Sequence, residues 1–189
     1  LDINGRHIDT ARFLIAHGAD INAKGNGDET LLHCAAKLDI ALVRYLVEHG
    51  LDVNARNKEG ATPLYHAIVN DRLDIAEYLI SRGADIATSI TGSTPLIVCA
   101  AISSSRKTLE YLVKNGVDIN ATDDDGLNAM HVAAAVNPNT ATRRFLAEKG
   151  FAEPSESELK KAAKKYKSAY FGFLYHPYTF KHEDIIKYM

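Results

Sequence analysis

The sequence has no tryptophan, and aromatic residues make up only 8% of its 189 positions. A core built from this composition must consist mainly of leucine, isoleucine, valine and alanine. The two cysteines, Cys34 and Cys99, are too few for the disulfide framework of a small secreted domain. Because both stand in apolar runs, we interpret them as small reduced hydrophobic residues and expect a cytoplasmic protein.

An excess of one charge is also missing, since 22 basic and 24 acidic residues give a formal net charge of −2 at pH 7. This balance provides no global field that would attract nucleic acid or an anionic membrane. No apolar run approaches the length of a membrane span. Hydrophobic residues nevertheless make up 46% of the chain, as in ordinary folded proteins. We therefore expect a monomer that binds no nucleic acid and has no membrane span.

What the sequence does contain is an internal repeat of about 33 residues. A phrase that reads His-Gly-Ala-Asp-Ile-Asn in its first copy begins at His17, His49, Arg82 and Asn115, and Gly150 continues the series. A second phrase, fullest as Thr-Pro-Leu, runs in phase with it from Thr30, Thr62, Thr94 and Asn128. Two signals that stay in phase over four or five periods are typical of a repeat protein.

These phrases resemble the ankyrin repeat, whose signature reads T-P-L-H-x-A. The resemblance covers residues 1 to about 150 and implies an all-α solenoid, in which each unit is a pair of antiparallel helices with a short β-hairpin loop. We expect no extended sheet. The predicted divisions are a partial repeat at 1–24, repeats at about 25–57, 58–89, 90–122 and 123–150, and a helical capping segment at 151–189.

The chemistry of the fullest copy supports this interpretation. The hydroxyl of Thr62 can cap the first helix, and Pro63 suits its first position, where no amide hydrogen is needed. A second helix is predicted from Leu73 to Ser81, and Gly83 suits the left-handed residue that ends it. In the partial repeat the opening helix is missing, which leaves residues 8–17 as an exposed second helix.

An aromatic residue recurs at one position of the second helix in five successive units. We interpret this column as rings that stack repeat on repeat inside the solenoid, because a periodic apolar column is typical of such a core. The alternative is an aromatic strip that binds a partner. The five residues are Phe13, Tyr45, Tyr78, Tyr111 and Phe145.

After Gly150 the repeat stops, and the spacing of Ser155 and Glu158 predicts a helix start with a capping box. Apolar residues then recur at helical spacing, and lysines take the other faces. The helix is expected to end at Gly172 or at residues 176–177, with a short helix over 182–188. We interpret the long helix as an end cap with a charged outer face; the alternative is a lysine surface for phosphate or acidic lipid.

No catalytic or metal-binding constellation is apparent. His33 and His131 occupy the histidine of the signature, and the resemblance implies that they form structural hydrogen bonds between neighbouring repeats. The two histidines stand three repeats apart, too far to share a metal, and the two cysteines are too far apart for a disulfide. We therefore expect that the protein is not an enzyme and holds no metal or cofactor.

The resemblance implies that a partner binds the hairpin tips and the first helices, which together line the concave side of the stack. The corresponding tip residues are Asn26, Glu29, Lys58, Glu59, Ala61, Thr91, Ser93, Asp124, Asp125 and Leu127. The corresponding helix residues are Lys37, Val69, Asn70, Ile102, Ser103, Ala135 and Val136. Residues 123–125 form an acidic cluster, which a solvated turn would explain equally well.

The expected function is a protein-interaction module, an adaptor or scaffold whose partner is another protein. The alternative is a targeting domain of a larger enzyme or pathogen effector, which could act in the host cytosol or nucleus. It is motivated by the missing start methionine and the missing half-repeat, which indicate part of a longer protein. Asn22, Asn54 and Asn120 also resemble a position that is hydroxylated in animal ankyrin proteins; holding the hairpin is the structural alternative.

Overall fold

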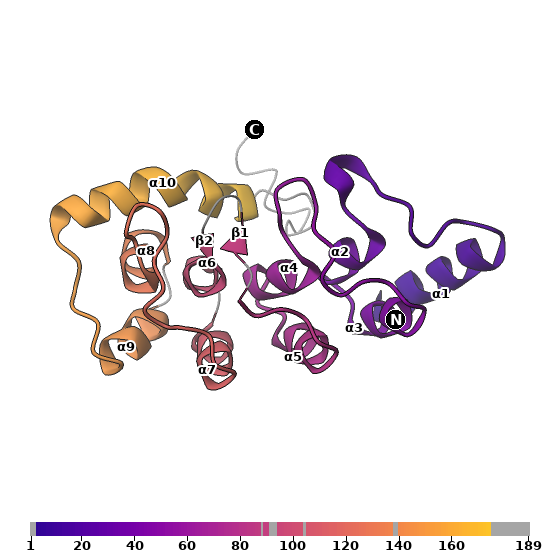
Figure 1. Cartoon of the computed structure of the whole chain (residues 1–189), viewed down its shortest axis with the longest axis horizontal. Helices are drawn as coiled ribbons and strands as arrows, with labels where there is room; N and C mark the ends of the chain where they lie inside the picture. The colour runs from indigo at the N-terminus through magenta and orange to yellow at the C-terminus, as the bar shows by residue number, and fades with distance from the viewer. Residues whose placement is uncertain (1–2, 88, 91–93, 104, 138–139, 175–189) are drawn as a thin grey trace.

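The computed structural model describes residues 3–87, 89–90, 94–103, 105–137 and 140–174. Within them the helices form two parallel rows of a stack, with loops that project to one side (Figure 1). The first helices of units 2 to 5 are α2 (Leu31–Ala35), α4 (Pro63–Val69), α6 (Leu96–Ser103) and α8 (Ala129–Val136). The second helices of units 1 to 5 are α1 (Ile3–Ala16), α3 (Ile40–Glu48), α5 (Leu73–Ser81), α7 (Arg106–Lys114) and α9 (Thr140–Glu148).

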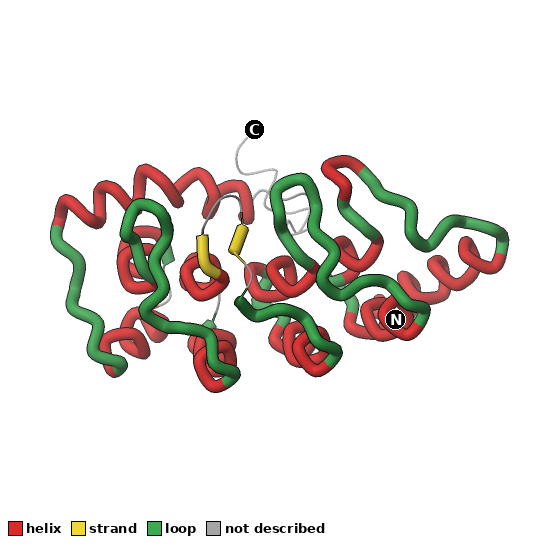
Figure 2. The backbone as a smooth tube through the Cα atoms, viewed as in Figure 1, coloured by secondary structure: helices red, strands yellow, loops and turns green. Residues whose placement is uncertain are grey.

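Strand structure in the described residues is confined to the loops, and Figure 2 shows how little of the chain it occupies. β1 (Ser89–Ile90) pairs antiparallel with β2 (Thr94–Pro95), and one isolated bridge joins Lys24 to Thr30. A short 3₁₀ helix, η1 (Asn26–Asp28), forms another loop tip. The expectation of an all-α solenoid without an extended sheet is therefore confirmed.

The capping signals of unit 3 operate as the sequence predicts. The Thr62 hydroxyl oxygen accepts a hydrogen bond from the backbone N–H of Tyr65 at 3.2 Å, and Pro63 opens α4. The second helix of this unit spans the predicted residues, Leu73–Ser81. Gly83 follows it with a φ of 88°, in the left-handed region that a residue with a Cβ rarely adopts.

Packing is local along the stack. Each first helix lies against the second helix of its own unit and the first helix of the next, and in the second row α1 packs on α3, α3 on α5 and α7 on α9. One apolar core runs through all units, from Ala11 to Tyr166. Cys99 is buried beside this core, whereas Cys34 is exposed. Stability therefore passes mainly between neighbouring units.

Polar side chains also join consecutive units. His33 lies 3.0 Å from the carbonyl oxygen of Ala61 through its Nε2, which matches the implied bond between repeats. Asn54 donates to the carbonyl oxygen of Gly83 at 3.0 Å and accepts from the N–H of Asp85 at 2.8 Å. Asn54 therefore holds two loops together. His131 differs from His33, because its Nε2 lies against a glutamate of α10.

The aromatic column does not form the expected stack of rings. Among the described side chains, guanidinium groups lie between its members: Arg12 lies over Tyr45, with its Cζ 5.2 Å from the ring centroid. The corresponding distance is 4.9 Å from Arg44 to Tyr78 and 5.5 Å from Arg106 to Phe145. Cation–π contacts therefore join α1 to α3, α3 to α5 and α7 to α9.

Two helices differ from their predicted form. α1 begins at Ile3, five residues before the expected start, and ends at Ala16. α10 (Glu156–Leu174) continues through Gly172, so that glycine does not end it; the expected short helix at 182–188 lies outside the described residues. α10 packs against α8 and reaches α6, and it lies along the row of first helices (Figures 1 and 2). It packs on the last unit, and it does so along the first helix of that unit, α8, rather than at the end of the stack.

Candidate functional site

The predicted partner-binding residues lie along the loop tips and the first-helix row, and α10 divides them into two halves. In units 2 and 3 the exposed tip candidates are Asn26, on η1, and the neighbouring Lys58 and Glu59. The two tips contact each other through the backbone, since the N–H of Lys58 donates to the carbonyl oxygen of Gly27 at 2.8 Å. They therefore form one continuous edge.

Behind these tips a polar network joins the residues that flank α2 to His66 of α4. The ammonium of Lys37 donates to Glu29 at 3.1 Å, and Nε2 of His66 lies 3.3 Å from the same carboxylate. Burial alone would raise the pKa of Glu29, but the hydrogen bond and the charge of Lys37 outweigh it and lower that pKa. Glu29 is thus held ionised between two units, on the surface where a partner is predicted to bind.

Several predicted residues prove unsuitable as a contact surface. The side chains of Ala61, Val69, Ile102 and Leu127 are buried, because these loop and helix positions turn toward the core. Asn70 is half-buried and donates from its side chain to the carbonyl oxygen of His66 at 2.8 Å. Outside the described residues lie Thr91 and Ser93, and the side chain of Ser103.

In unit 5 the acidic loop is engaged by α10. Asp123 is only 5% exposed; it accepts hydrogen bonds from the N–H of Leu127 at 2.9 Å and from the phenol of Tyr166. Lys165 forms ion pairs with Asp123 at 2.9 Å and with Asp125 at 2.5 Å. Lys161 donates to the carbonyl oxygen of Asp125 at 2.7 Å. The acidic cluster is therefore the docking point of α10 rather than an open turn.

The protonation equilibria follow these contacts. Burial opposes ionisation of Asp123, but hydrogen bonds from Tyr166 and Lys165 prevail and lower its pKa. Burial similarly opposes the charged form of Lys165, yet the two aspartates raise its pKa. Burial and the bond to Asp123 together raise the pKa of Tyr166, so its phenol stays protonated and donates. The cluster thus holds α10 in place through the charge of Lys165 and the opposite charges of Asp123 and Asp125.

The start of α10 has a second attachment. Ser155 caps the helix: its hydroxyl oxygen accepts from the N–H of Glu158 at 3.4 Å, and its own N–H donates to the Glu158 carboxylate at 2.7 Å, which is the predicted pairing. Glu158 also lies 3.4 Å from Nε2 of His131 on α8. Hydrogen bonds from the side chain and backbone of Ser155, with a further contribution from His131, lower the pKa of Glu158 to about 2.

The sequence pattern does not predict that α10 covers the first helices of units 4 and 5. The sequence pattern places the lysines of α10 on a charged outer face, yet Lys161 and Lys165 stand four residues apart and share one helix face. Their partners, Asp123 and Asp125, stand two residues apart in one loop. Two basic residues on one helix face match two acidic residues in one loop. This match is the signal from which the contact between α10 and the loop could have been predicted.

Acid is expected to loosen α10. Because the pKa values of Asp123 and Asp125 lie below their ordinary value of 3.8 in the folded chain, they stabilise it above that pH, and the contribution is lost as the pH falls through the folded values. Amide hydrogen exchange, corrected for intrinsic rates, should show α10 losing protection below about pH 4. Asp125→Asn should reduce this pH dependence, and identical protection at pH 6 and pH 3 would contradict the assignment.

No group of three His, Cys, Asp or Glu side chains in the described part of the chain is placed to hold a metal ion. None of the helices described is both long and apolar enough to cross a bilayer.

A stack of paired helices with projecting loops defines a helical-repeat solenoid, a class whose extended surfaces serve for binding. Family models for ankyrin repeats match the chain in two segments: one described as three copies covers residues 3–90, and one described as many copies covers residues 97–146. The chain belongs to the ankyrin repeat family. Domains of this family are generally protein–protein interaction modules and are typically non-catalytic. No curated protein matches the chain.

Proposed function

We propose that this chain is an adaptor or scaffold domain that binds another protein through the loop tips and first helices of units 2 and 3. The observation that carries the proposal is the position of α10, which takes up the corresponding surface of units 4 and 5. A single helix of this chain lies on that row, so the row has a shape that accommodates a polypeptide. Units 2 and 3 present the same row beside exposed, charged tips.

The chemistry of this edge favours a polar partner surface. Lys58 and Glu59 stand next to each other on an exposed tip, and Asn26 lies on the adjoining one. Rim charges of both signs set orientation and encounter rate more than affinity. Behind them, the carboxylate of Glu29 is already paired with Lys37 and lies against His66, so it provides a fixed charge rather than a free group.

Exchange of the two charges at the tip should weaken partner capture. In Lys58→Glu/Glu59→Lys the two charges exchange places while the net charge stays constant, so loss of binding would report local complementarity. Quantitative affinity purification from cells should recover a defined set of proteins with the parent chain. The recovered amount of these proteins should fall at least tenfold with the variant, because a mispaired interface charge costs about 1.5–3 kcal/mol or more.

Glu48→Lys provides the matched control. Glu48 is exposed on α3, in the second-helix row, on an element that carries none of the predicted contacts. This variant should retain the same captured set. Equal capture by both variants, or loss with Glu48→Lys alone, would place the binding surface on another part of the stack.

A further inference from the structure

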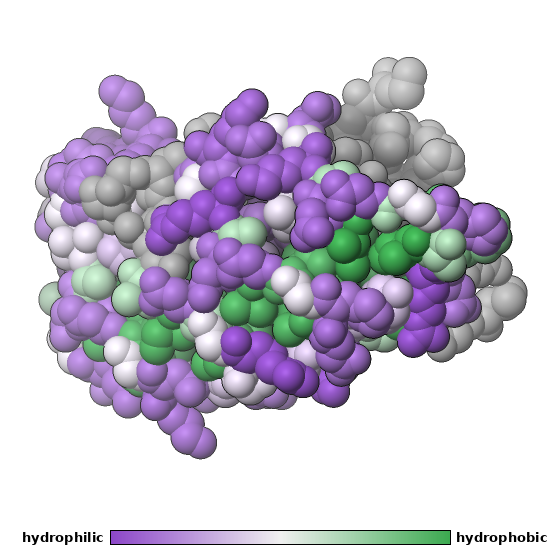
Figure 3. Space-filling model, turned by 45° about the vertical axis from the view of Figure 1, so that its right-hand side comes forward, coloured by the Kyte–Doolittle hydropathy of each residue, from purple (hydrophilic) through white to green (hydrophobic). Residues whose placement is uncertain are grey.

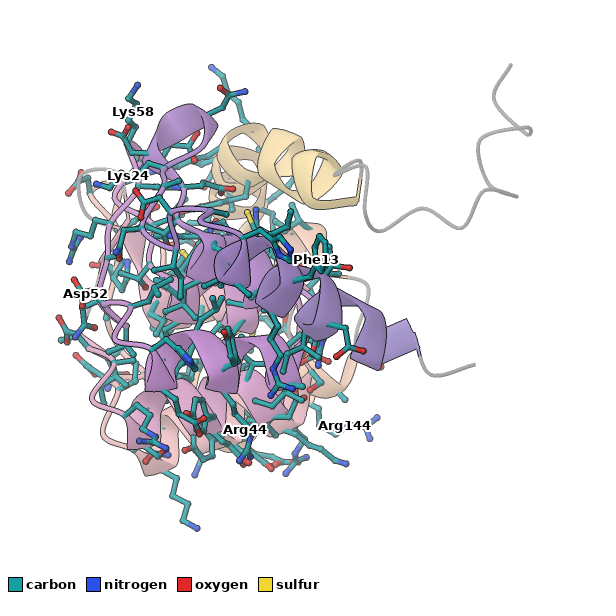
Figure 4. All side chains as sticks on the ribbon, turned by 90° about the vertical axis from the view of Figure 1, so that its right-hand side faces the viewer. Phe13, Lys24, Arg44, Asp52, Lys58 and Arg144 are labelled. Carbon is teal, nitrogen blue, oxygen red and sulfur yellow. The ribbon has the colours of Figure 1, made fainter. Side chains whose placement is uncertain are left out.

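Two successive loops enclose a polar cavity of about 310 Å³, between the loop that joins units 1 and 2 and the loop that joins units 2 and 3. Asn22 and Lys24 line it from the first loop, and Asp52 and Arg56 line it from the second. Figure 4 shows Lys24 and Asp52 on the same side of the molecule as Lys58 of the proposed binding edge. The surface in Figure 3, where the unit 1 end is turned forward, is mostly hydrophilic with apolar patches. The cavity therefore lies beside the edge where a partner is proposed to bind.

The cavity is open because a link that closes the next joint is missing here. At the next joint, Asn54 holds two loops together through Gly83 and Asp85, at 3.0 and 2.8 Å. Asn22 is the corresponding residue at this joint. Its one hydrogen bond among the described residues is donated by its backbone N–H to the carboxylate of Asp20, at 2.9 Å. The side-chain amide of Asn22 therefore lines the cavity without a partner of its own.

The two basic groups of the lining come from different loops. Lys24 forms no ion pair with any described residue, whereas Lys37 and Lys165 pair with carboxylates beside them. Arg56 donates to the carbonyl oxygen of Gly60 in its own loop at 3.3 Å, and a guanidinium has further N–H groups to offer. The cavity thus presents cationic hydrogen-bond donors from both of its sides.

The charges of the lining restrict the kind of occupant. Asp52 supplies its one carboxylate and accepts from the N–H of Asn54 at 2.8 Å, so this group is engaged in its own loop. Two cations against one carboxylate leave an excess of positive charge, which favours an anionic group rich in acceptors. The repulsion from Asp52 grows with the charge of the occupant, so a singly charged carboxylate fits better than a phosphate.

We propose that this cavity takes one acidic side chain, an aspartate or a glutamate, of the protein that binds at units 2 and 3. Lys24 and Arg56 form ion pairs with its carboxylate, and the side-chain amide of Asn22 donates a further hydrogen bond. The inference rests on the proposed function and specifies the partner, which places an acidic residue between the loops while it lies along their tips. The bound carboxylate links these two loops as Asn54 links the next two.

The probe is the capped tripeptide acetyl-Gly-Glu-Gly-amide, titrated into the full isotope-labelled chain at neutral pH and constant ionic strength. Backbone amide signals in two-dimensional NMR should shift saturably at residues 22–24 and 52–56. The matched peptide with glutamine should cause no such shift, because it lacks the charge. Lys24→Gln and Arg56→Gln should each weaken binding about tenfold, since charge-assisted hydrogen bonds are the strong ones. Both side chains are exposed, so folding should survive, and the spectra show whether it does.

Lys107→Gln is the matched control, because Lys107 is an exposed lysine on α7 in the second-helix row. It should bind the glutamate peptide as the parent does. Equal shifts with both peptides, unchanged binding by Lys24→Gln and Arg56→Gln, or the same loss with Lys107→Gln would overturn the proposal. Tighter binding of a phosphoserine peptide would also overturn it, because phosphate would then be the preferred occupant.

The proposed function and the cavity fail in distinguishable ways. If the glutamate peptide binds as expected but Lys58→Glu/Glu59→Lys leaves partner capture unchanged, the proposed function fails and the cavity remains a carboxylate site. If capture depends on the two tip residues but the peptide does not bind, the cavity proposal alone is wrong. Where both hold, Lys24→Gln should also lower the capture of the partner proteins, and Lys107→Gln should not.

Discussion

Removal of residues 155–189 is expected to loosen unit 5 first and to promote aggregation. α10 contributes Ala162 and Tyr166 to the continuous core, and both are buried. Burial of a large apolar side chain is worth about 1.5–3 kcal/mol, and in a solenoid the loss is felt mainly by the adjacent unit. Asp123 would also lose the phenol and the ammonium that hold it.

Hydrogen exchange resolved along the chain, together with thermal melting, measures this effect. Amides of α8 should lose protection in the truncated chain, whereas those of α4 and α5 should keep most of theirs. A chain that lacks only residues 175–189 separates the contribution of α10 from that of the end. If the longer deletion melts like the parent, α10 is not part of the folded unit.

The lysines of α10 are expected to fall into two groups. Exposed lysines contribute little to stability, and Lys164→Gln should be neutral within about 0.5 kcal/mol. Lys165 differs, since it is half-buried and pairs with Asp123 and Asp125. The charged outer face expected from the sequence therefore does not describe Lys165, which pairs with the acidic loop.

The repeat architecture could be predicted because its signals are local. Thr62, Pro63 and Gly83 act within a few residues of their own positions, so their chemistry predicts where the helices of unit 3 begin and end. Periodicity then extends the result to the other units. The same locality explains why the start of α1 was missed: its first five residues lie outside any repeated phrase.

The surface was harder to predict because it depends on contacts between distant segments. Helical spacing showed that α10 has an apolar face with Ala162 and Tyr166, but not which helices that face covers. Ala61 and Leu127 stand at loop positions that family resemblance assigns to the tips, yet their side chains turn into the core. Whether a loop side chain points in or out depends on the neighbouring unit, which no single phrase of the sequence contains.

Leu79→Ala in α5 is expected to lower the free energy of unfolding by about 2–5 kcal/mol. Leu79 has no exposed surface and belongs to the continuous core in the middle unit of the stack. The cavity cannot collapse easily because α5 is held by α3 on one side and by α4 on the other. Urea unfolding followed by circular dichroism gives the difference between the variant and the parent, with Leu38→Ala as the control at an exposed leucine. The control should cost less than about 1 kcal/mol.

Since stability is passed only between neighbours, a weakened middle unit should also split the transition, with the two ends of the stack unfolding at different urea concentrations. A single unshifted transition for Leu79→Ala would mean that α5 does not pack in the core as described.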